Sequence, residues 1–434
     1  MVNKINEIYI KKGHEKDILK HLKEEKEDTK AIEKSVLEIV EDVKKRQDEA
    51  IYYYLKKFDK IEGDPPYRLR VEKREIDEAY EKVRKDILSS FEKAIERVEK
   101  FHKFQKEKSW IVYDEEGSTY GVLIRPLKRI GIYVPGGRAS YPSTLIMGAV
   151  PAKIAGVKEI VVVTPPSPFM EVSPYILAVA KLLGIDEIYK MGGAYAIAAL
   201  AYGTESVNRV DKIVGPGNIY VTFAKKLAWG DVDIDSLAGP SEVVVVGDDT
   251  SSPELVALDL IAQAEHDPMA RAILISPSEK LIESVRSIIF EYIDVQPRKE
   301  IITESIAKRG FIVRTEDIES AVSVSNFIAP EHLQLSVDDP FNLLSLIENA
   351  GAVFLGHHAS VPLGDYIAGT NHILPTGRRA RFSSGLGIHS FYKRIDFFYT
   401  KKELSEKLGK EASPMAEVEG FFAHRDRLLG RSRK

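Results

Sequence analysis

The spacing of apolar residues changes once along the chain. Between residues 16 and 105, apolar side chains such as Ala79, Tyr80 and Val83 recur every three to four positions among charged ones. That period predicts amphipathic helices. After Gly117, short runs rich in Ile and Val alternate with helical stretches. Strands separated by helices predict crossover connections and parallel sheets.

The strands and helices expected from this rhythm can be placed along the chain. Strands are expected at residues 130–134, 159–164, 187–191, 212–214, 242–246, 272–276, 311–314 and 352–355. Helices are expected at 143–155, 174–183 and from 253 to 266. The rhythm is long enough to favour two doubly wound sheets over one. It is lost after about residue 384, where a small helical appendage is expected.

Length and composition agree with a folded protein of two large domains. The chain has 434 residues, and single hydrophobic cores stop growing near roughly 250–300 residues. Hydrophobic residues make up 44% of the sequence, which is typical of globular proteins. The net charge of -4 is small and both signs are mixed. No broad surface is therefore expected for nucleic acid or anionic membranes, and the basic end, Arg425–Lys434, is interpreted as a solvated tail.

No targeting or membrane segment is expected. The N-terminal residues Met1-Val2-Asn3-Lys4 soon become polar and are not followed by the apolar core of a signal peptide. The best candidate for a membrane span, residues 142–157, is interrupted by Pro151 and Lys153. The expected compartment is therefore the cytoplasm.

The sequence contains no cysteine. Disulfides and thiolate metal sites are therefore excluded. No reaction step can pass through a cysteine thioester or thiohemiacetal.

Three glycine-rich turns follow expected strands. They are Gly136-Gly137, Gly192-Gly193 and Gly215-Pro216-Gly217. A glycine turn at a helix N-terminus lets backbone N–H groups approach a phosphate. None of the three is the G-x-G-x-x-G fingerprint of dinucleotide-binding proteins, and a single turn of this kind is more often an ordinary strand-to-helix turn. Together they favour an anion site without identifying the anion.

Histidines gather late in the chain, where seven of the ten lie from His266 onward. Gln263 and His266 are three residues apart near the end of an expected helix and share one face. Asp365 is expected in a loop after a strand, followed by His372, and His424 lies in the C-terminal appendage. Imidazole and carboxylate ligands suit zinc. No standard zinc spacing matches, and a structural role remains the alternative for each histidine alone.

One acidic residue directly precedes a histidine in Ala329-Pro330-Glu331-His332, which is expected in a loop after a helix. Histidine suits general base catalysis near neutral pH, and a carboxylate can activate water. The pair is therefore a candidate for proton transfer, although a bare dipeptide carries little information.

Taken in order, these segments resemble the histidinol dehydrogenase family. The resemblance covers roughly residues 100 to 424. Its motifs are Gly131–Gly137, Gly192-Gly193-Ala194, Gly215–Asn218, Ala238–Glu242, Gln263–His266, Ala329–His332, Gly364-Asp365-Tyr366, Gly369–Gly377, and Glu419 with His424. The resemblance implies oxidation of L-histidinol to L-histidine through the aldehyde, with two successive hydride transfers to NAD in the last step of histidine biosynthesis.

The resemblance also implies a set of site residues. One Zn²⁺ per subunit would be bound by Gln263, His266, Asp365 and His424. The substrate would contact these four ligands and Ser241, His332, His372 and Glu419. NAD would contact Tyr133, Asn218 and the residue at position 195. Glu331 and His332 would be catalytic, with His332 taking the alcohol proton and Glu331 activating water.

One residue departs from the family pattern, and one implication concerns assembly. Family members often carry Gln at the position of Tyr195, so the cofactor contact there is expected to differ. The family forms homodimers, which implies that Glu419 and His424 complete the active site of the neighbouring subunit.

The expected fold is α/β, with two incomplete Rossmann-like, doubly wound parallel-sheet domains and small helical appendages at both ends. The expected segments are a helical arm at 1–25, a first domain at 26–131 and 239–380, an NAD-binding domain at 132–238, and an appendage at 381–434.

Two other classes of function use the same residues. A zinc hydrolase would employ metal-bound water and no nicotinamide, and a metal- or nucleotide-binding regulator would not turn over. A dehydrogenase of a related amino alcohol is a third alternative.

Overall fold

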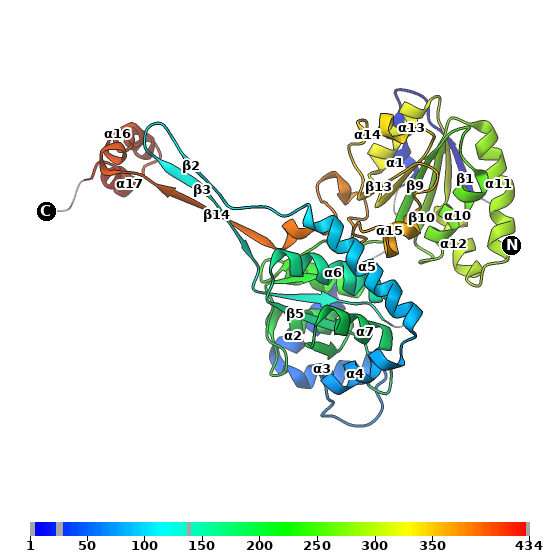
Figure 1. Ribbon diagram of the computed structural model, residues 1–434, viewed down its shortest axis with the longest axis horizontal. Helices are drawn as coiled ribbons and strands as arrows, with labels where there is room; N and C mark the ends of the chain where they lie inside the picture. The colour runs from blue at the N-terminus through cyan, green and yellow to red at the C-terminus, as the bar shows by residue number, and fades with distance from the viewer. Residues whose placement is uncertain (1–4, 23–28, 137–139, 431–434) are drawn as a thin grey trace.

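The computed structural model describes residues 5–22, 29–136 and 140–430. Two α/β bodies lie side by side, and a narrow arm projects from one of them (Figure 1). The arm ends in the C-terminal helices. None of the helices within these ranges is long and apolar enough to cross a membrane.

The first body is built on a six-stranded sheet in the order β1-β11-β10-β9-β12-β13. All its neighbouring strands are parallel. The strands are β1 (Asn6–Tyr9), β9 (Glu242–Gly247), β10 (Arg271–Ser276), β11 (Phe311–Arg314), β12 (His332–Ser336) and β13 (Ala352–Leu355). The central strand β9 is a continuous run of valines, and its neighbour β10 is mostly apolar, because helices cover both faces of the sheet.

Helices on the two faces of this sheet form separate apolar clusters. On one face pack α10 (Pro253–Ala264), α11 (Glu279–Asp294) and α12 (Lys299–Arg309). On the other face pack α1 (Ile18–His21), α13 (Ile318–Ile328) and α14 (Pro340–Leu344). The short helix α15 (Val361–Tyr366) follows β13 and carries Asp365, which was expected in a loop.

The second body is built on a five-stranded parallel sheet in the order β6-β5-β4-β7-β8. Its strands are β4 (Arg129–Tyr133), β5 (Glu159–Thr164), β6 (Ile188–Lys190), β7 (Lys212–Val214) and β8 (Asp233–Ile234). The crossover helices are α6 (Pro142–Ala155), α7 (Pro174–Leu183), α8 (Gly193–Tyr202) and α9 (Ile219–Ala228). Two doubly wound sheets are therefore present, as the rhythm predicted.

The N-terminal helices belong to the second body, which corrects the expected division of the chain. These helices are α2 (Lys30–Arg46), α3 (Asp48–Phe58), α4 (Lys73–Lys82) and α5 (Lys85–Lys103). They pack on α6, α7, α8 and α9, and their apolar faces join the two clusters around the five-stranded sheet. The placement of residues 26–131 with the six-stranded sheet was wrong. Residues 1–25 are also not simply a helical arm, because β1 pairs with β11.

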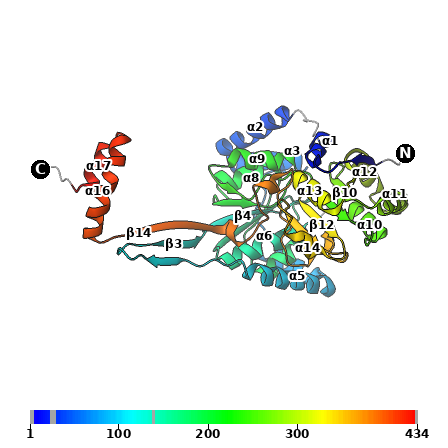
Figure 2. The same cartoon turned by 90° about the horizontal axis from the view of Figure 1, so that it is seen from above.

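The projecting arm is an antiparallel sheet in the order β14-β3-β2. It consists of β2 (Trp110–Tyr113), β3 (Thr119–Pro126) and β14 (Tyr392–Tyr399), and it leads to α16 (Lys402–Val418) and α17 (Phe422–Leu428). Figure 2 shows both helices at the tip, well away from the two bodies. The expectation of a purely helical appendage missed the eight-residue strand β14. Short 3-10 turns complete the chain at Glu15–Asp17, Arg379–Arg381 and Ile388–Phe391.

Candidate active site

The predicted catalytic residues lie where the edges of the two sheets meet. Glu331 and His332 stand at the amino end of β12, beside Glu242 at the amino end of β9. A cavity of about 50 Å³ opens there. It is lined by Pro216 and Asp235, which follow β7 and β8 of the five-stranded sheet, and by residues of the other body that include Ser241, Glu331 and His372. The carboxyl edge of one sheet therefore faces the amino edge of the other across the cavity.

His332 is buried and held in one orientation. Its Nδ1–H donates to the carbonyl oxygen of Glu242 at 3.0 Å, which leaves Nε2 directed toward Asp365, 3.7 Å from Oδ1. The carboxylate of Glu331 accepts the backbone N–H of Glu242 at 2.9 Å and lies 3.6 Å from Nδ1 of His332. His332, which was expected in a loop, is thus the first residue of β12. The carbonyl oxygen of Glu242 on the neighbouring strand β9 keeps a proton on Nδ1 of His332.

The ionisable groups of this cluster strongly shift one another's pKa values. Burial raises the pKa of Glu331 to about 7, against the opposing effect of His332. Burial alone would lower the pKa of His332, but the carboxylates of Glu331 and Asp365 outweigh it and raise the pKa to about 9. The pKa of Asp365 stays below its usual value because His332 overcomes the effect of burial. Buried groups whose pKa values are strongly shifted by their neighbours are typical of functional sites.

Three of the four predicted zinc ligands lie in this region. His266 and Asp365 are close enough to influence each other electrostatically, and burial lowers the pKa of His266, which favours the neutral imidazole that metals bind. Gln263 is 3% exposed one turn earlier, and neither atom of its amide has a hydrogen-bond partner among the described residues. Within those residues, no three His, Asp or Glu side chains by themselves form a metal cage.

The fourth predicted ligand and one predicted substrate contact are elsewhere. His424 lies in α17 and Glu419 caps α16, and both are exposed at the tip of the arm. Figure 1 shows this tip on the far side of the molecule from β9 and α15. Within one chain, the structure does not bring these two residues to His332.

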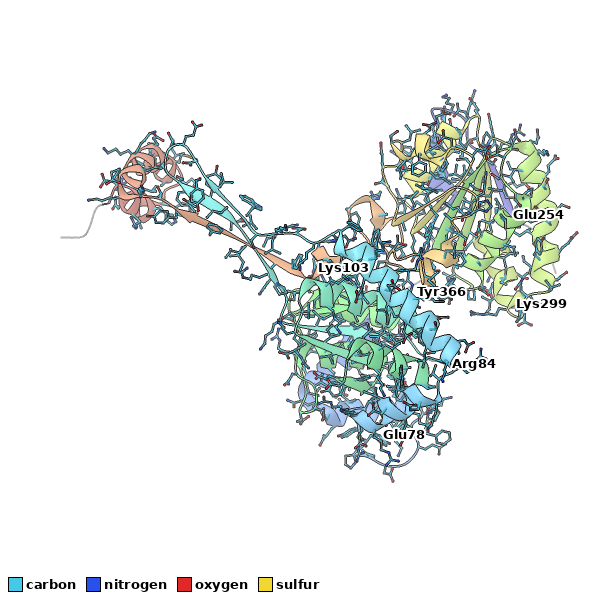
Figure 3. All side chains as sticks on the ribbon, in the orientation of Figure 1. Glu78, Arg84, Lys103, Glu254, Lys299 and Tyr366 are labelled. Atoms are coloured by element: carbon cyan, nitrogen blue, oxygen red, sulfur yellow. The ribbon has the colours of Figure 1, made fainter. Side chains whose placement is uncertain are left out.

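The loop that carries His372 joins the two bodies. Nδ1 of His372 donates to the carbonyl oxygen of Asp365 at 2.8 Å. The preceding residue, Asn371, donates to the carbonyl oxygen of Met147 in α6 at 2.8 Å. Figure 3 labels Tyr366, which follows Asp365, between α5 and the six-stranded sheet. Sequence reasoning missed Asn371, although an asparagine flanking a candidate histidine is a reasonable signal for a positioning role.

The residues predicted to contact NAD lie at the carboxyl edge of the five-stranded sheet. Tyr133 ends β4 and is 4% exposed, and Tyr195 in α8 is 1% exposed. The backbone N–H of Gly193 donates to the Tyr133 hydroxyl at 3.2 Å, and that of Gly192 donates to the Tyr195 hydroxyl at 3.2 Å. The two N–H groups of this turn are therefore engaged by tyrosines, which disfavours the phosphate site considered for it.

The backbone N–H groups of the other two glycine turns have different surroundings. At the turn after β7, the N–H of Gly215 donates to Asp235 at 2.7 Å, and the buried Lys225 forms an ion pair with the same carboxylate. The amide oxygen of Asn218 accepts the N–H of Val221 at 3.1 Å and caps α9. Of the turn after β4, residues 137–139 lie outside the described residues. Lys225 and Asp235 were not singled out from the sequence, although a lysine among apolar residues, as at position 225, can signal a buried partner.

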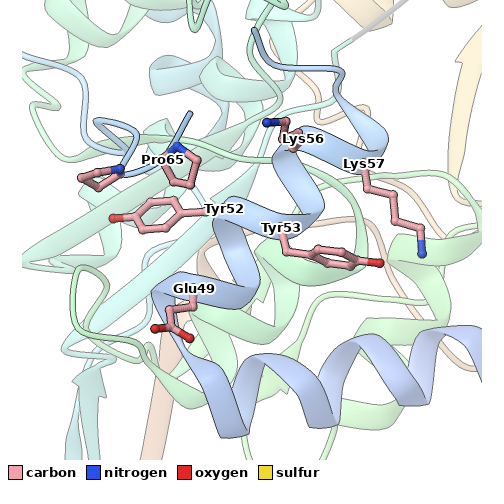
Figure 4. A pocket seen from close by; sticks show the side chains of 7 residues that line it. Glu49, Tyr52, Tyr53, Lys56, Lys57 and Pro65 are labelled. Atoms are coloured by element: carbon pink, nitrogen blue, oxygen red, sulfur yellow. The ribbon is translucent and has the colours of Figure 1, made fainter. Parts of the chain in front are cut away.

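A much larger hollow lies elsewhere. It measures about 720 Å³ and lies between α3 and the Pro65-Pro66 segment. Figure 4 shows its wall of tyrosine and lysine side chains, which include Tyr52, Tyr53 and Lys56. None of the predicted site residues lines it, so the smaller cavity at the junction remains the candidate active site.

Comparisons with known proteins agree with this geometry. A family model described as histidinol dehydrogenase matches residues 22–431. The histidinol dehydrogenase of Syntrophotalea carbinolica is 47% identical over 393 residues, which are 91% of either chain. That of Caldanaerobacter subterraneus subsp. tengcongensis is 47% identical over 397 residues, which are 92% of either chain. The solved structure of histidinol dehydrogenase from Elizabethkingia anophelis has a TM-score of 0.91 at 38% identity, covering 98% of this chain and 97% of that one.

Proposed function

The chain belongs to the histidinol dehydrogenase family, and on that premise we propose how its residues share the reaction. The enzyme oxidises L-histidinol to L-histidine by way of L-histidinaldehyde, with NAD taking up a hydride in each of two steps. The observation that carries our division of labour is the buried Glu331-His332 pair beside Asp365 at the junction of the two sheets.

His332 acts as the base in both oxidations, in its deprotonated form. In the first step it takes the alcohol proton as the hydride leaves the carbon, which gives the aldehyde. Glu331 then removes a proton from water as the water oxygen adds to the aldehyde carbon, and the protonated His332 returns its proton to the carbonyl oxygen, which gives the hydrate and frees His332 for the second oxidation. A second deprotonation and hydride transfer yield the carboxylate. Direct addition of water fits the sequence, which has no cysteine to form a thiohemiacetal or thioester intermediate.

The residues present fit the zinc that the family implies. The unpartnered amide of Gln263 and the neutral imidazole of His266 are free to bind a cation, and Asp365 supplies a charge. These three, with the partner subunit's His424, would hold one Zn²⁺ per subunit. When bound, the metal would hold and orient the substrate through the imidazole and amino nitrogens of L-histidinol. Ser241, His372 and the partner subunit's Glu419 would complete the substrate contacts.

We place the cofactor on the five-stranded sheet. Strand order runs outward from β4 through β5 and β6 on one side, and through β7 and β8 on the other. Nucleotides bind outside the carboxyl ends of the strands at such a reversal. Tyr133 and Asn218 flank this point, and the candidate cavity lies beside it.

The arm supports a homodimer with shared active sites. Its strands expose large apolar side chains, among them Trp110, Tyr113 and Phe398, and Val418 of α16 is 90% exposed. Several large apolar side chains exposed on one narrow arm are typical of a protein interface. A second copy of the chain would cover it and bring Glu419 and His424 to the neighbouring site. A cytoplasmic location is the expectation for such an NAD-dependent biosynthetic enzyme.

The test is oxidation of L-histidinol with NAD, followed by NADH absorbance and product analysis. We expect two NADH and one L-histidine per L-histidinol. A zinc hydrolase would form no NADH, and a binding regulator would show no turnover. Faster oxidation of another amino alcohol than of L-histidinol would overturn the substrate assignment.

A further inference from the structure

A hydrogen-bonded chain connects a distant aspartate to the Gly192-Gly193 turn. The Tyr195 hydroxyl donates to Oδ2 of Asp59 and accepts the N–H of Gly192. The Tyr133 hydroxyl accepts the next N–H of the turn, that of Gly193. Both N–H groups of the turn are thus held by buried tyrosines, and one of these tyrosines is anchored by a carboxylate.

The packing around this chain leaves it little freedom. Asp59 ends α3 as its C-cap. The ring of Tyr54 stacks on Tyr195 with centroids 5.8 Å apart, and Phe58 stacks on Tyr54 at 5.5 Å. Stacked aromatic rings of this kind add specific geometry to their burial. The carboxylate therefore reaches the turn through a buried tyrosine whose ring is stacked on Tyr54.

Burying the carboxylate of Asp59 costs folding free energy. Burial raises its pKa to about 6, and the Tyr195 hydroxyl only partly opposes this effect. An ionised carboxylate in such surroundings destabilises the fold unless hydrogen bonds compensate it. A group kept at a cost beside a candidate cofactor site suggests a role in that site.

The Gly192-Gly193 turn is packed tightly against Pro165. A Cβ atom at Gly192 would meet Cβ of Pro165 at 2.7 Å, and one at Gly136 would meet Cγ of the same proline at 2.7 Å. Gly193 has a φ of 59°, in the left-handed region. The turn after β6 and the loop after β4 therefore abut the same residue, at the edge of the sheet where the cofactor is placed.

We propose that Asp59 is a positioning residue for the nicotinamide cofactor, acting through Tyr195 on the Gly192-Gly193 turn. The proposal rests on the proposed function, since it requires NAD at the carboxyl edge of the five-stranded sheet. Because the tyrosines take both N–H groups, the turn acts as a fixed wall of the cofactor site rather than as a phosphate ligand. The substrate cluster around His332 lies in the other body and is independent of it.

The test uses the full-length, zinc-loaded enzyme with the variants Tyr195→Phe, Asp59→Ala and the two combined. We expect KM for NAD to rise about three- to tenfold in each single variant, as for the loss of one hydrogen bond. KM for L-histidinol and kcat at saturating NAD stay near the wild-type values. The double variant is no worse than the worse single variant, because both changes break the same chain.

Two further variants separate positioning from general stability. Asp59→Asn keeps an oxygen that accepts the tyrosine hydroxyl, so it is expected to retain the wild-type KM for NAD. Tyr189→Phe is the matched control, because Tyr189 is also buried in this body and donates to the carbonyl oxygen of Ser206 at 2.8 Å, away from the turn. It is expected to leave KM for NAD unchanged.

Several outcomes would overturn the positioning role. These are an unchanged KM for NAD in Tyr195→Phe and Asp59→Ala, an equal rise in Tyr189→Phe, or additive effects in the double variant. If Tyr195→Phe does not fold, Asp59→Ala and Asp59→Asn carry the comparison, with direct titration of NAD as the readout. Failure of the wild-type enzyme to oxidise L-histidinol would instead refute the proposed function.

Discussion

The division of the active site between two subunits can be tested by mixing two inactive variants. His332→Asn places a defect in the body, and His424→Ala places one at the tip of the arm. The strand β14 has eight residues, which span about 27 Å at the rise of an antiparallel strand. His424 is exposed beyond that strand, so its replacement is not expected to disturb the core of its own chain.

The recovered activity follows from two-fold symmetry. If His424 serves the neighbouring subunit, a mixed dimer has one site with both defects and one site with none. Random reassociation makes about half of the dimers mixed, so about a quarter of wild-type activity is expected. If His424 served its own subunit, every site in the mixed dimer would carry one defect, and activity would stay at background.

The assay is NADH formation after the two variants are dissociated together and allowed to reassociate. Mass spectrometry or paired affinity tags establish that mixed dimers have formed. A mixture of His332→Asn with Asp365→Asn is the control, because both changes lie in the same body and no intact site can arise. Background activity from a verified mixed dimer of the His332 and His424 variants would refute the shared site.

Three further predictions follow from the site and its surroundings. Glu331→Gln is expected to keep most L-histidinol oxidation but to slow L-histidinaldehyde oxidation by about 100-fold, as for loss of a general base. Equal losses in separate assays of the two half-reactions would contradict the division of labour. A chelator is expected to abolish activity and Zn²⁺ to restore it, whereas full activity in verified metal-free protein would remove the metal from the site. Asp259 is buried in α10, one turn before Gln263. Burial raises the pKa of Asp259 to about 6, so the folded protein binds this proton more tightly than the unfolded chain, and stability is lost as pH rises from about 4 to 6. Asp259→Asn is therefore expected to be more stable than wild type by about 3 kcal/mol above pH 6, with no gain near pH 4, and urea unfolding at the two pH values checks this.

Strands buried on both faces could be predicted well from the sequence. The expected strands at 159–164 and 212–214 coincide with β5 and β7, because a strand covered by helices on both sides is a continuous apolar run. The strand β14 was missed for the opposite reason. Its residues Tyr392–Tyr399 mix charged and aromatic side chains, and most of them are exposed in a single chain. No core within the chain imposes a pattern on them.

The assignment of helices to sheets could not be predicted from periodicity. The apolar stripe of α2 is suited to either sheet, and only tertiary packing places it against α8 and α9. Asp59 escaped notice for a similar reason. A single aspartate at a helix end is common, and the tyrosine that it anchors is 136 residues away in sequence.

The sequence motifs pointed to candidate site residues but did not predict the secondary structure in which they lie. Family motifs pointed to His332 and Asp365, but Ala329-Pro330 suggested a loop where β12 begins, and α15 was not expected. The contacts that orient His332 come from Glu242 on an adjacent strand. Such contacts depend on the pairing of β9 with β12, which a single sequence does not specify.

The loop around His372 has a mechanical consequence. Asn371 is tied to α6 of one body, and His372, the next residue, is tied to α15 of the other. Adjacent Cα atoms are about 3.8 Å apart and this spacing cannot stretch. Any rotation between the two bodies must therefore displace the imidazole or break one of these two bonds. While both hydrogen bonds are intact, a change in the angle between the two sheets therefore also moves the side chain of His372.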